Sequence, residues 1–454
     1  MSSVLRVNHL HLRNFRCFSE CAFDLHETLT VLVAENGQGK TAILDSIGDA
    51  LEVFVDAISG TRQFHGLKLG DVRLQQNGGG GMDPSLPSGF TASGLVSGQN
   101  IQWGREIKTF GRQSRASKKN IENFKLAAST MRENLENGQE QPSYRLLPLV
   151  AFYGTGRLWN ETDVNEGRKR RFPAAEGRLS GYADCLSSKA SFSGLLGWFQ
   201  NTMLETGDPR FSTRLTENLA LLEAVRTATR TVLAPTKWEE LIWNPEYRRL
   251  DVKHPDYGLL PLSALSDGVR NMIALVADIA RRCASLNPDL GEQAATQTPG
   301  VLLIDEVDMH LHPGWQQLVI GLLRQAFPSL QMVLTTHSPQ VLSTVDKASI
   351  RVIRLRGTQG IVQTPTLQTR GVQSGDVLAS IMGVDPTPHQ LEESHWLNQY
   401  RALIEDGHAE SEDAQALRSK LVHHFSESHP LILDCDRLIR FQTFKLKRNQ
   451  TEKE

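Results

Sequence analysis

The sequence is poor in cysteine and in long apolar runs, and both shortages restrict the class of protein. Its 454 residues include five cysteines, and no two of them are spaced as Cys-x-x-Cys. Scattered thiols in odd number are typical of a reducing compartment and argue against a disulfide framework or a structural metal site. No run of about 18 apolar residues occurs, and no basic segment followed by an apolar core opens the chain. We therefore expect a cytoplasmic protein with no membrane association.

The chain also lacks an excess of charge of either sign. Its formal net charge is −2, charged residues make up 22% of the chain, and hydrophobic residues make up 39%. This composition is that of a soluble globular protein whose length allows two or three domains. No global basic field indicates a nucleic-acid partner, although local patches can still bind one.

Apolar patterning predicts an α/β protein. Short apolar runs predict buried strands, and apolar residues at helical spacing between them predict helices. Alternation of this kind is typical of a mixed, mainly parallel sheet with helices on both faces. The predicted strands are 5–15, 29–33, 149–153, 301–304 and 332–335, and the predicted helices are 41–57, 272–285 and 314–326.

Four other segments depart from this alternation. A Gly/Ser-rich stretch at about 71–110 predicts a flexible loop and an antiparallel β layer, and 114–137 predicts an exposed helix. Residues from about 160 to 250 predict a helical lobe that ends in strand-like sequence. After residue 355 the parallel pattern stops, and a polar, helix-rich segment follows.

A glycine-rich segment fits the P-loop pattern GxxxxGK[ST] at every position but the first, and it lies between a predicted strand and a predicted helix. Backbone N–H groups of such a loop surround phosphates, the lysine reaches the β and γ oxygens, and the hydroxyl binds Mg²⁺. The segment therefore predicts an ATP·Mg²⁺ site. Its residues are Ala34, Glu35, Asn36, Gly37, Gln38, Gly39, Lys40 and Thr41.

Two carboxylates follow the apolar run 301–304, at the end of a strand where α/β sheets bind ligands. Asp305 is placed to hold Mg²⁺ or one of its waters. Glu306 is placed to polarise the attacking water, because water alone is a poor nucleophile toward a phosphate. Adjacent acids also occur as solvated loop residues, so the functional interpretation of this pair depends on the presence of the P-loop.

Leu-Ser-Asp-Gly-Val-Arg precedes an apolar helix and predicts a second anion site at a helix N-terminus. Its candidate residues are Ser266, Asp267, Gly268 and Arg270. An ordinary serine N-cap is the alternative explanation.

Single residues near these motifs are further candidates. His337, in Thr-Thr-His-Ser after the strand 332–335, is placed to contact the γ-phosphate. Arg157 follows another strand and either senses that phosphate or is an ordinary surface arginine. His310 and His312 are explained equally well by function or by packing around a helix-capping proline.

Five segments together resemble the RecF/SMC-like and OLD-like ABC-type ATPases over about residues 1–355. They are Asn14-Phe15-Arg16, the P-loop, the late Ser266 motif, Ile-Asp-Glu-Val-Asp-Met-His-Leu-His-Pro and Thr-Thr-His-Ser-Pro. The β layer, Phe-Tyr-Gly-Thr-Gly-Arg and the C-terminal sequence look like the PtuA ATPases of Septu anti-phage systems and some retrons. Ala34 in place of the first P-loop glycine is the chief departure, and it is tolerated if its φ is negative.

The resemblance implies an ABC-type P-loop ATPase domain over 1–355 and a C-terminal segment, 356–454, for partner docking or oligomerisation. It implies that the motif at Ser266 completes the ATP site of a second protomer in a head-to-tail sandwich. It also implies an anti-phage defence complex, in which this subunit controls a separate HNH nuclease. In a retron, a reverse transcriptase with its non-coding RNA is a further expected partner.

We expect no nuclease centre in the chain itself. Asp434 and Asp436 loosely resemble the paired acids of TOPRIM nucleases, but only about twenty residues follow them, too few for the βαβ units of that sheet. The basic cluster at 168–171 is either a DNA or RNA contact or solvated surface.

Three alternatives to a defence ATPase remain. They are a RecF-like DNA repair or recombination ATPase, a nucleotide-binding subunit of a membrane transporter, and a scaffold that holds ATP and scarcely hydrolyses it. The absence of a recognisable Q-loop glutamine weighs against the transporter subunit.

Overall fold

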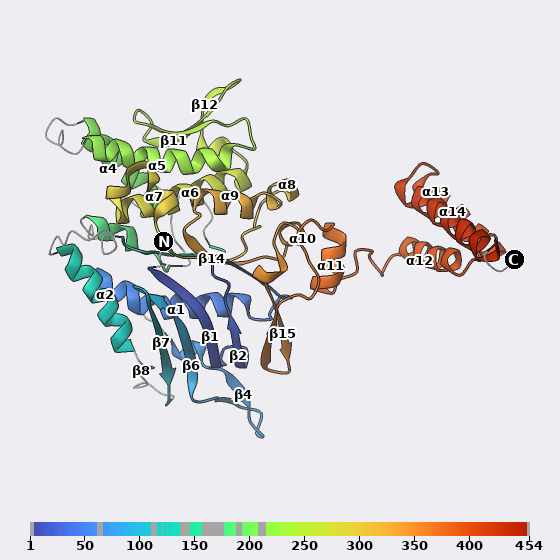
Figure 1. Ribbon diagram of the computed structural model, residues 1–454, viewed down its shortest axis with the longest axis horizontal. Coiled ribbons are helices and arrows are strands. Elements are labelled where there is room, and N and C mark those ends of the chain that lie inside the picture. Colours follow the sequence, from blue (N-terminus) through green and yellow to red (C-terminus); the bar gives the residue numbers. More distant parts are fainter. Residues whose placement is uncertain are drawn as a thin grey trace. The chain divides into compact units, whose positions relative to one another are not determined.

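The computed structural model describes residues 4–60, 67–109, 116–119, 121–136, 146–156, 177–187, 193–207 and 215–451 (Figure 1). The chain divides into two compact units, Met1–Val377 and Leu378–Glu454. No helix among the described residues is both long and apolar enough to cross a membrane.

An eleven-stranded mixed sheet forms the centre of the first unit, in the order β8-β7-β6-β1-β2-β16-β15-β3-β14-β13-β9. The predicted α/β class is confirmed. The strands are β1 (Leu5–Phe15), β2 (Phe18–Asp24), β3 (Leu29–Val33), β6 (Ser88–Val96), β7 (Gln99–Ile107), β8 (Ala116–Lys119), β9 (Leu149–Tyr153), β13 (Gly300–Ile304), β14 (Leu330–Thr335), β15 (Ile350–Arg356) and β16 (Gln359–Gln363).

The parallel half of the sheet contains the strands that the apolar runs predict. β3 lies between β15 and β14, and β13 lies between β14 and β9, all in parallel register. Every residue of β3, β9, β13 and β14 is buried, as expected for parallel strands covered on both faces. The loops after β3 and β13 therefore meet at one edge of the sheet.

The other half is antiparallel and contains the expected β layer. β6 and β7 form a hairpin that extends the sheet beyond β1, and β8 adds a further strand. A separate hairpin of β4 (Leu74–Gln76) and β5 (Met82–Pro84) orders part of the glycine-rich stretch that we expect to be flexible.

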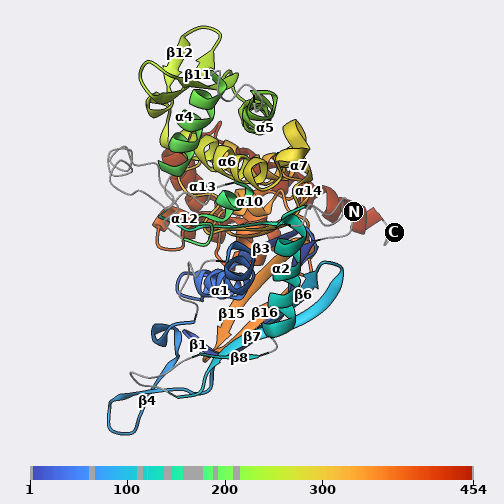
Figure 2. The ribbon, with the colours of Figure 1, turned by 90° about the vertical axis from the view of Figure 1, so that its left-hand side faces the viewer.

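Two faces of this sheet carry different helices. α1 (Lys40–Ser59) packs with α2 (Ile121–Glu136) beside β6 and β7, as Figure 2 shows. α6 (Asp267–Leu286) packs on β9 and on α5 (Leu215–Leu233), and α4 (Ser193–Gly207) packs on α5. Smaller helices of this unit include α7 (Ala294–Gln297), α9 (Val319–Ala326) and α10 (Pro339–Leu342).

The segment before α6 combines helices with a small sheet. α4 and α5 are followed by an antiparallel sheet of β10 (Glu240–Asn244), β11 (Arg249–His254) and β12 (Gly258–Pro261). The strand-like sequence before the Ser266 motif therefore does form strands.

Three of the sequence expectations are wrong in detail. The helix expected over 114–137 begins only at Ile121, because 116–119 extend as β8 along the β7 edge. The helix expected over 314–326 is broken into α8 (Pro313–Gln316) and α9, with Gln316 hydrogen-bonded back to the loop before it. The sheet also continues past residue 355, because β16 returns antiparallel to β15 and pairs with β2.

The second unit is a bundle of helices. α12 (Glu392–Glu405), α13 (Glu412–Phe425) and α14 (Pro430–Thr451) pack around a core that includes Leu397, Tyr400, Leu421 and Ile432. α11 (Ser374–Met382) begins in the first unit and ends in the second.

Candidate functional site

The P-loop connects the buried strand β3 to α1. Gly37 and Gly39 have φ of 77° and 90°, a region that favours glycine. A Cβ on Gly39 would lie 2.3 Å from the buried Phe18 ring, so glycine is also required sterically. Ala34 is buried and does not have a positive φ, which meets the condition for alanine at the first position of the motif.

The side chains of the loop are held by the chain itself. Lys40 Nζ donates to the carbonyl oxygens of Ala34 at 2.9 Å and of Glu35 at 3.1 Å. Gln38 accepts a hydrogen bond of 2.9 Å from the backbone N–H of Leu355, which ties the loop to β15. Asn36 is exposed at the tip.

The structure brings the P-loop and the acidic pair together. Thr41 Oγ1 donates to Asp305 Oδ2 at 2.9 Å, although the two residues are 264 positions apart in the sequence. Asp305 is buried and Thr41 is exposed. A hydroxyl and a carboxylate in contact are hard oxygen ligands of the kind that Mg²⁺ prefers, so these residues fit the ion.

Thr335 joins the two acids to the next strand. Its buried hydroxyl donates to Asp305 Oδ1 at 2.6 Å and accepts from the backbone N–H of Glu306 at 2.6 Å. Glu306 itself has φ 48°, a left-handed conformation that is uncommon for a residue with a side chain. The fold thus holds Glu306 in a conformation that it does not favour intrinsically.

The segment after β14 contacts the loop after β13 through further hydroxyl groups. Thr336 Oγ1 donates to Asp308 Oδ1 at 2.5 Å, and Ser338 Oγ donates to Gln316 Oε1 at 2.7 Å. His337, half-buried, lies between these two anchored residues.

The charges of the P-loop lysine and of the acidic pair act on the pKa of His337. Burial lowers the pKa of His337, and the charge of Lys40 lowers it further against the opposing effect of Glu306. Burial also lowers the pKa of Lys40, which the charges of Asp305 and Glu306 counteract. A neutral imidazole, an ammonium group and two carboxylates are therefore gathered in one site.

The Ser266 motif begins the long helix α6. Ser266 is the N-cap residue, but its side chain makes no capping hydrogen bond. Ser266 and Asp267 are exposed, and Gly268 is buried. Arg270 donates to Asp267 at 2.6 Å and to the carbonyl of Ser263 at 3.3 Å. The serine therefore lacks the cap bond that the alternative explanation requires.

The two histidines after Glu306 make local contacts with the starts of two helices. His312 caps α8, because its Nδ1 accepts from the backbone N–H of Gly314 at 3.2 Å. His310 has φ 62° and presents its carbonyl to Gly268. For His312 the packing explanation accounts for the residue.

Arg157 and the basic cluster at 168–171 fall outside the described residues. Asp434 and Asp436 lie on α14 and pair with Arg437 at 3.0 Å and Arg418 at 2.9 Å.

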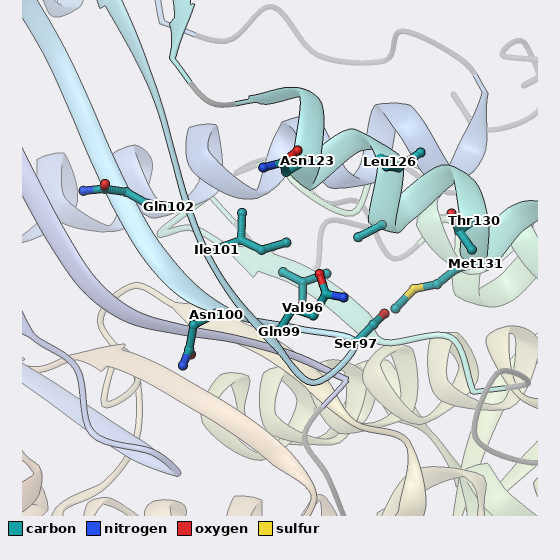
Figure 3. A pocket seen from close by; sticks show the side chains of 11 residues that line it. Val96, Ser97, Gln99, Asn100, Ile101, Gln102, Asn123, Leu126, Thr130 and Met131 are labelled. Carbon is teal, nitrogen blue, oxygen red and sulfur yellow. The ribbon is translucent and has the colours of Figure 1, made fainter.

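A surface hollow of about 620 Å³ lies between the β6–β7 hairpin and α2 (Figure 3). Polar side chains such as Gln99, Asn100 and Asn123 line it together with Leu126 and Met131. No residue of the motifs described above lines this hollow. It is therefore separate from the candidate site.

Sequence reasoning missed the residues that support the site. Thr335 and Thr336 belong to the recognised Thr-Thr-His-Ser motif, so their hydroxyls are a signal that was available. Gln316 and the Leu355 backbone have no local signal, because their contacts join segments distant in the sequence.

A protein-family model matches residues 29–343, and its description is "AAA domain, putative AbiEii toxin, Type IV TA system". Among curated proteins, the chain is similar to the retron Vc95 probable ATPase of Vibrio cholerae, with 24% identity covering 93% of this chain and 88% of that protein. It is 26% identical to the retron Ec83 probable ATPase of Escherichia coli, covering 95% and 86%. The Septu protein PtuA of Bacillus thuringiensis is 30% identical over 27% of this chain and 32% of its own length.

Among solved structures, an SMC head domain from Thermotoga maritima is 14% identical, covers 80% of this chain and 100% of its own, and has a TM-score of 0.42. An SMC head bound to the C-terminal winged-helix domain of ScpA is 15% identical, covers 79% and 97%, and has a TM-score of 0.45.

Proposed function

The chain belongs to the family of AAA domains described as putative AbiEii toxin, Type IV TA system, and it is an ATPase; on this premise we propose that it serves an anti-phage defence complex. In this proposal it binds and hydrolyses ATP in the cytoplasm, oligomerises, and controls an associated HNH nuclease. Its similarity to retron ATPases and to PtuA supports a defence role.

The observation that carries the proposal is the contact between Thr41 and Asp305 at 2.9 Å. Mg²⁺ would be held by these two oxygens and would neutralise charge on the phosphates. Lys40 would exchange its carbonyl partners for phosphate oxygens, and backbone N–H groups at the start of α1 would bind the remaining ones. Glu306 would accept the proton of the attacking water, and neutral His337 would donate to the γ-phosphate.

A second protomer would complete this site. Ser266 and Asp267 are exposed at the N-terminus of a 20-residue helix, where backbone N–H groups and the helix dipole favour an anion. We propose that Ser266, Gly268 and Arg270 bind the nucleotide of the facing molecule. Arg270 donates to Asp267 and to the carbonyl of Ser263 at this helix start, which places its charge beside the proposed anion site.

The C-terminal segment, 356–454, is proposed to dock partners or to oligomerise. One exposed face of α14 carries Phe441 and Phe444, with exposed fractions of 63% and 65%, together with Arg437 and Arg440. Exposed aromatic and arginine side chains are the types enriched in binding hot spots. The HNH nuclease is the proposed partner, with DNA or RNA and, in a retron, a reverse transcriptase and its non-coding RNA.

The test compares Lys40→Ala with Lys347→Ala in infected cells and in co-purification with neighbouring gene products. Lys347 is a half-buried lysine whose ammonium donates to the carbonyl of Thr366 at 2.7 Å, so its loss controls for a missing charge. We expect Lys40→Ala to abolish ATP hydrolysis and protection, and Lys347→Ala to retain both.

Protection that survives Lys40→Ala would refute the proposal. Protection without any co-purifying nuclease, with or without ATP, would refute the control of an HNH partner and favour a RecF-like repair role. Equal single-turnover rates for Glu306→Gln and wild type would show that Glu306 is not the base.

A further inference from the structure

A fully enclosed carboxylate lies in the middle of α6. Asp278 is 3% exposed and accepts four hydrogen bonds from three side chains. Arg281 donates twice to Oδ1, at 2.9 and 2.7 Å, and Arg282 donates to Oδ2 at 2.9 Å. The hydroxyl of Tyr153, also buried, donates to Oδ2 at 2.7 Å.

The cluster is charged. Burial alone would raise the pKa of Asp278, but Arg281 and Arg282 hold it well below its usual range. An ionised carboxylate away from water requires all of its donors, since each loss leaves charge uncompensated. Arg282 extends the cluster by donating to the carbonyls of Gly181 and Ala183. The positions of these side chains are therefore tightly determined.

Tyr153 belongs at the same time to the strand beside the acidic pair. It is the last residue of β9 and lies opposite Ile304 in the parallel pairing with β13. Its carbonyl accepts a hydrogen bond of 2.8 Å from the backbone N–H of Asp305. One residue thus contacts Asp305 through its backbone and α6 through its side chain.

α6 has a second contact with the loop after β13. A Cβ at Gly268 would lie 2.5 Å from the carbonyl oxygen of His310, so the helix start approaches that loop closely. Asp278 lies ten residues after Gly268, or about 15 Å along a helix. α6 therefore approaches the loop after β13 directly at Gly268 and is linked to Asp305 through Tyr153 at Asp278.

We propose that Tyr153 and Asp278 are positioning residues of the ATPase that couple two events into one movement. In the first event Ser266 and Gly268 close on the nucleotide of the facing protomer. In the second, Asp305 and Glu306 move into place at the chain's own nucleotide. This inference rests on the proposed sandwich of two protomers. Each nucleotide thereby affects hydrolysis of the other through α6 and the end of β9.

The test is Tyr153→Phe, which removes one hydroxyl and keeps the ring. The matched control is Tyr182→Phe, because Tyr182 is also fully buried and its hydroxyl donates one 2.7 Å hydrogen bond, to the carbonyl of Pro148 rather than to a group of α6. Steady-state ATP hydrolysis gives kcat, KM and the Hill coefficient for each protein, and the thermal midpoint reports folding. Sedimentation of the Glu306→Gln protein with ATP shows whether the sandwich forms at all.

We expect Tyr153→Phe to lower kcat about 10-fold and to bring the Hill coefficient from above 1 to 1, with monomer affinity for ATP unchanged. Tyr182→Phe should match wild type in both respects. Equal kinetic losses in the two variants, or none in Tyr153→Phe, would overturn the positioning role and leave the sandwich standing. Failure of the Glu306→Gln protein to associate with ATP would instead remove the sandwich, and the inference with it.

Discussion

The left-handed conformation of Glu306 leads to a prediction in which stability and activity change in opposite directions. Its φ is 48°, and its backbone N–H is bound by the hydroxyl of Thr335. Substitution by glycine relieves the strain between Cβ and the backbone, whereas substitution by alanine keeps it. Both variants lack the carboxylate, so a comparison between them isolates the backbone effect.

The size of the effect follows from two opposing free energies. A residue with a Cβ in the left-handed region costs about 1–2 kcal/mol relative to glycine. Glycine in turn loses about 0.5–1 kcal/mol more conformational free energy on folding. Taking the middle of each range, Glu306→Gly should therefore be more stable than Glu306→Ala by about 0.75 kcal/mol, and both should lose about 10²–10⁴-fold in hydrolysis rate if Glu306 is the base.

The assay is urea unfolding of the two variants and of Glu306→Gln, which keeps both the strain and the shape of the side chain. Circular dichroism and tryptophan fluorescence report the midpoints, and phosphate release reports hydrolysis. A midpoint for Glu306→Ala equal to or above that of Glu306→Gly would refute the reasoning, because the conformation would then cost no more than the conformational free energy that glycine loses on folding. As a control, Ala→Gly at Ala42, inside α1, should lower the midpoint.

Two further predictions follow from residues close to the P-loop. Burial, and then the neighbouring acids Asp71, Glu52 and Asp45, raise the pKa of Asp49 from 3.8 to about 7. Below pH 4 both the folded and the unfolded state hold the proton, and between pH 4 and 7 only the folded state does. The free energy of unfolding therefore falls as pH rises and levels off above pH 7. Asp49→Asn should gain little stability over wild type at pH 4 and at most about 4 kcal/mol at pH 8, measured by urea midpoints. Ala34→Gly should leave kcat and KM within about twofold of wild type in the ATPase assay, because Ala34 does not have a positive φ; a large gain in rate would show that the alanine restrains turnover.

The parallel strands and the P-loop could be predicted because their signals are local. An apolar run before a glycine loop, or before two acids, identifies a buried strand and its functional end without knowledge of the rest. β3 has the bounds that its apolar run indicates, and β13 differs by one residue. For the same reason Asp305 and Thr41 could be placed in one site.

The elements that could not be predicted depend on distant partners. β8 and β16 have no strong strand pattern, and they extend because other strands pair with them, β7 with β8 and the distant β2 with β16. Glu306, with its left-handed φ, donates its backbone N–H to the hydroxyl of Thr335, 29 residues later. The contact of Tyr153 with Asp278 spans 125 residues, and neither residue stands in a recognisable motif with the other.

The position of β3 in the sheet determines when the P-loop can be completed during synthesis. β3 is made early but pairs with β14 and β15, which end at Thr335 and Arg356, and Gln38 is bound by the backbone of Leu355. At about 5–20 residues per second, a ribosome needs roughly 15–65 s to travel from one to the other. Until β14 is made, β3 has neither of its parallel neighbours. We therefore expect ATP binding only in chains whose synthesis has passed the parallel strands beside β3.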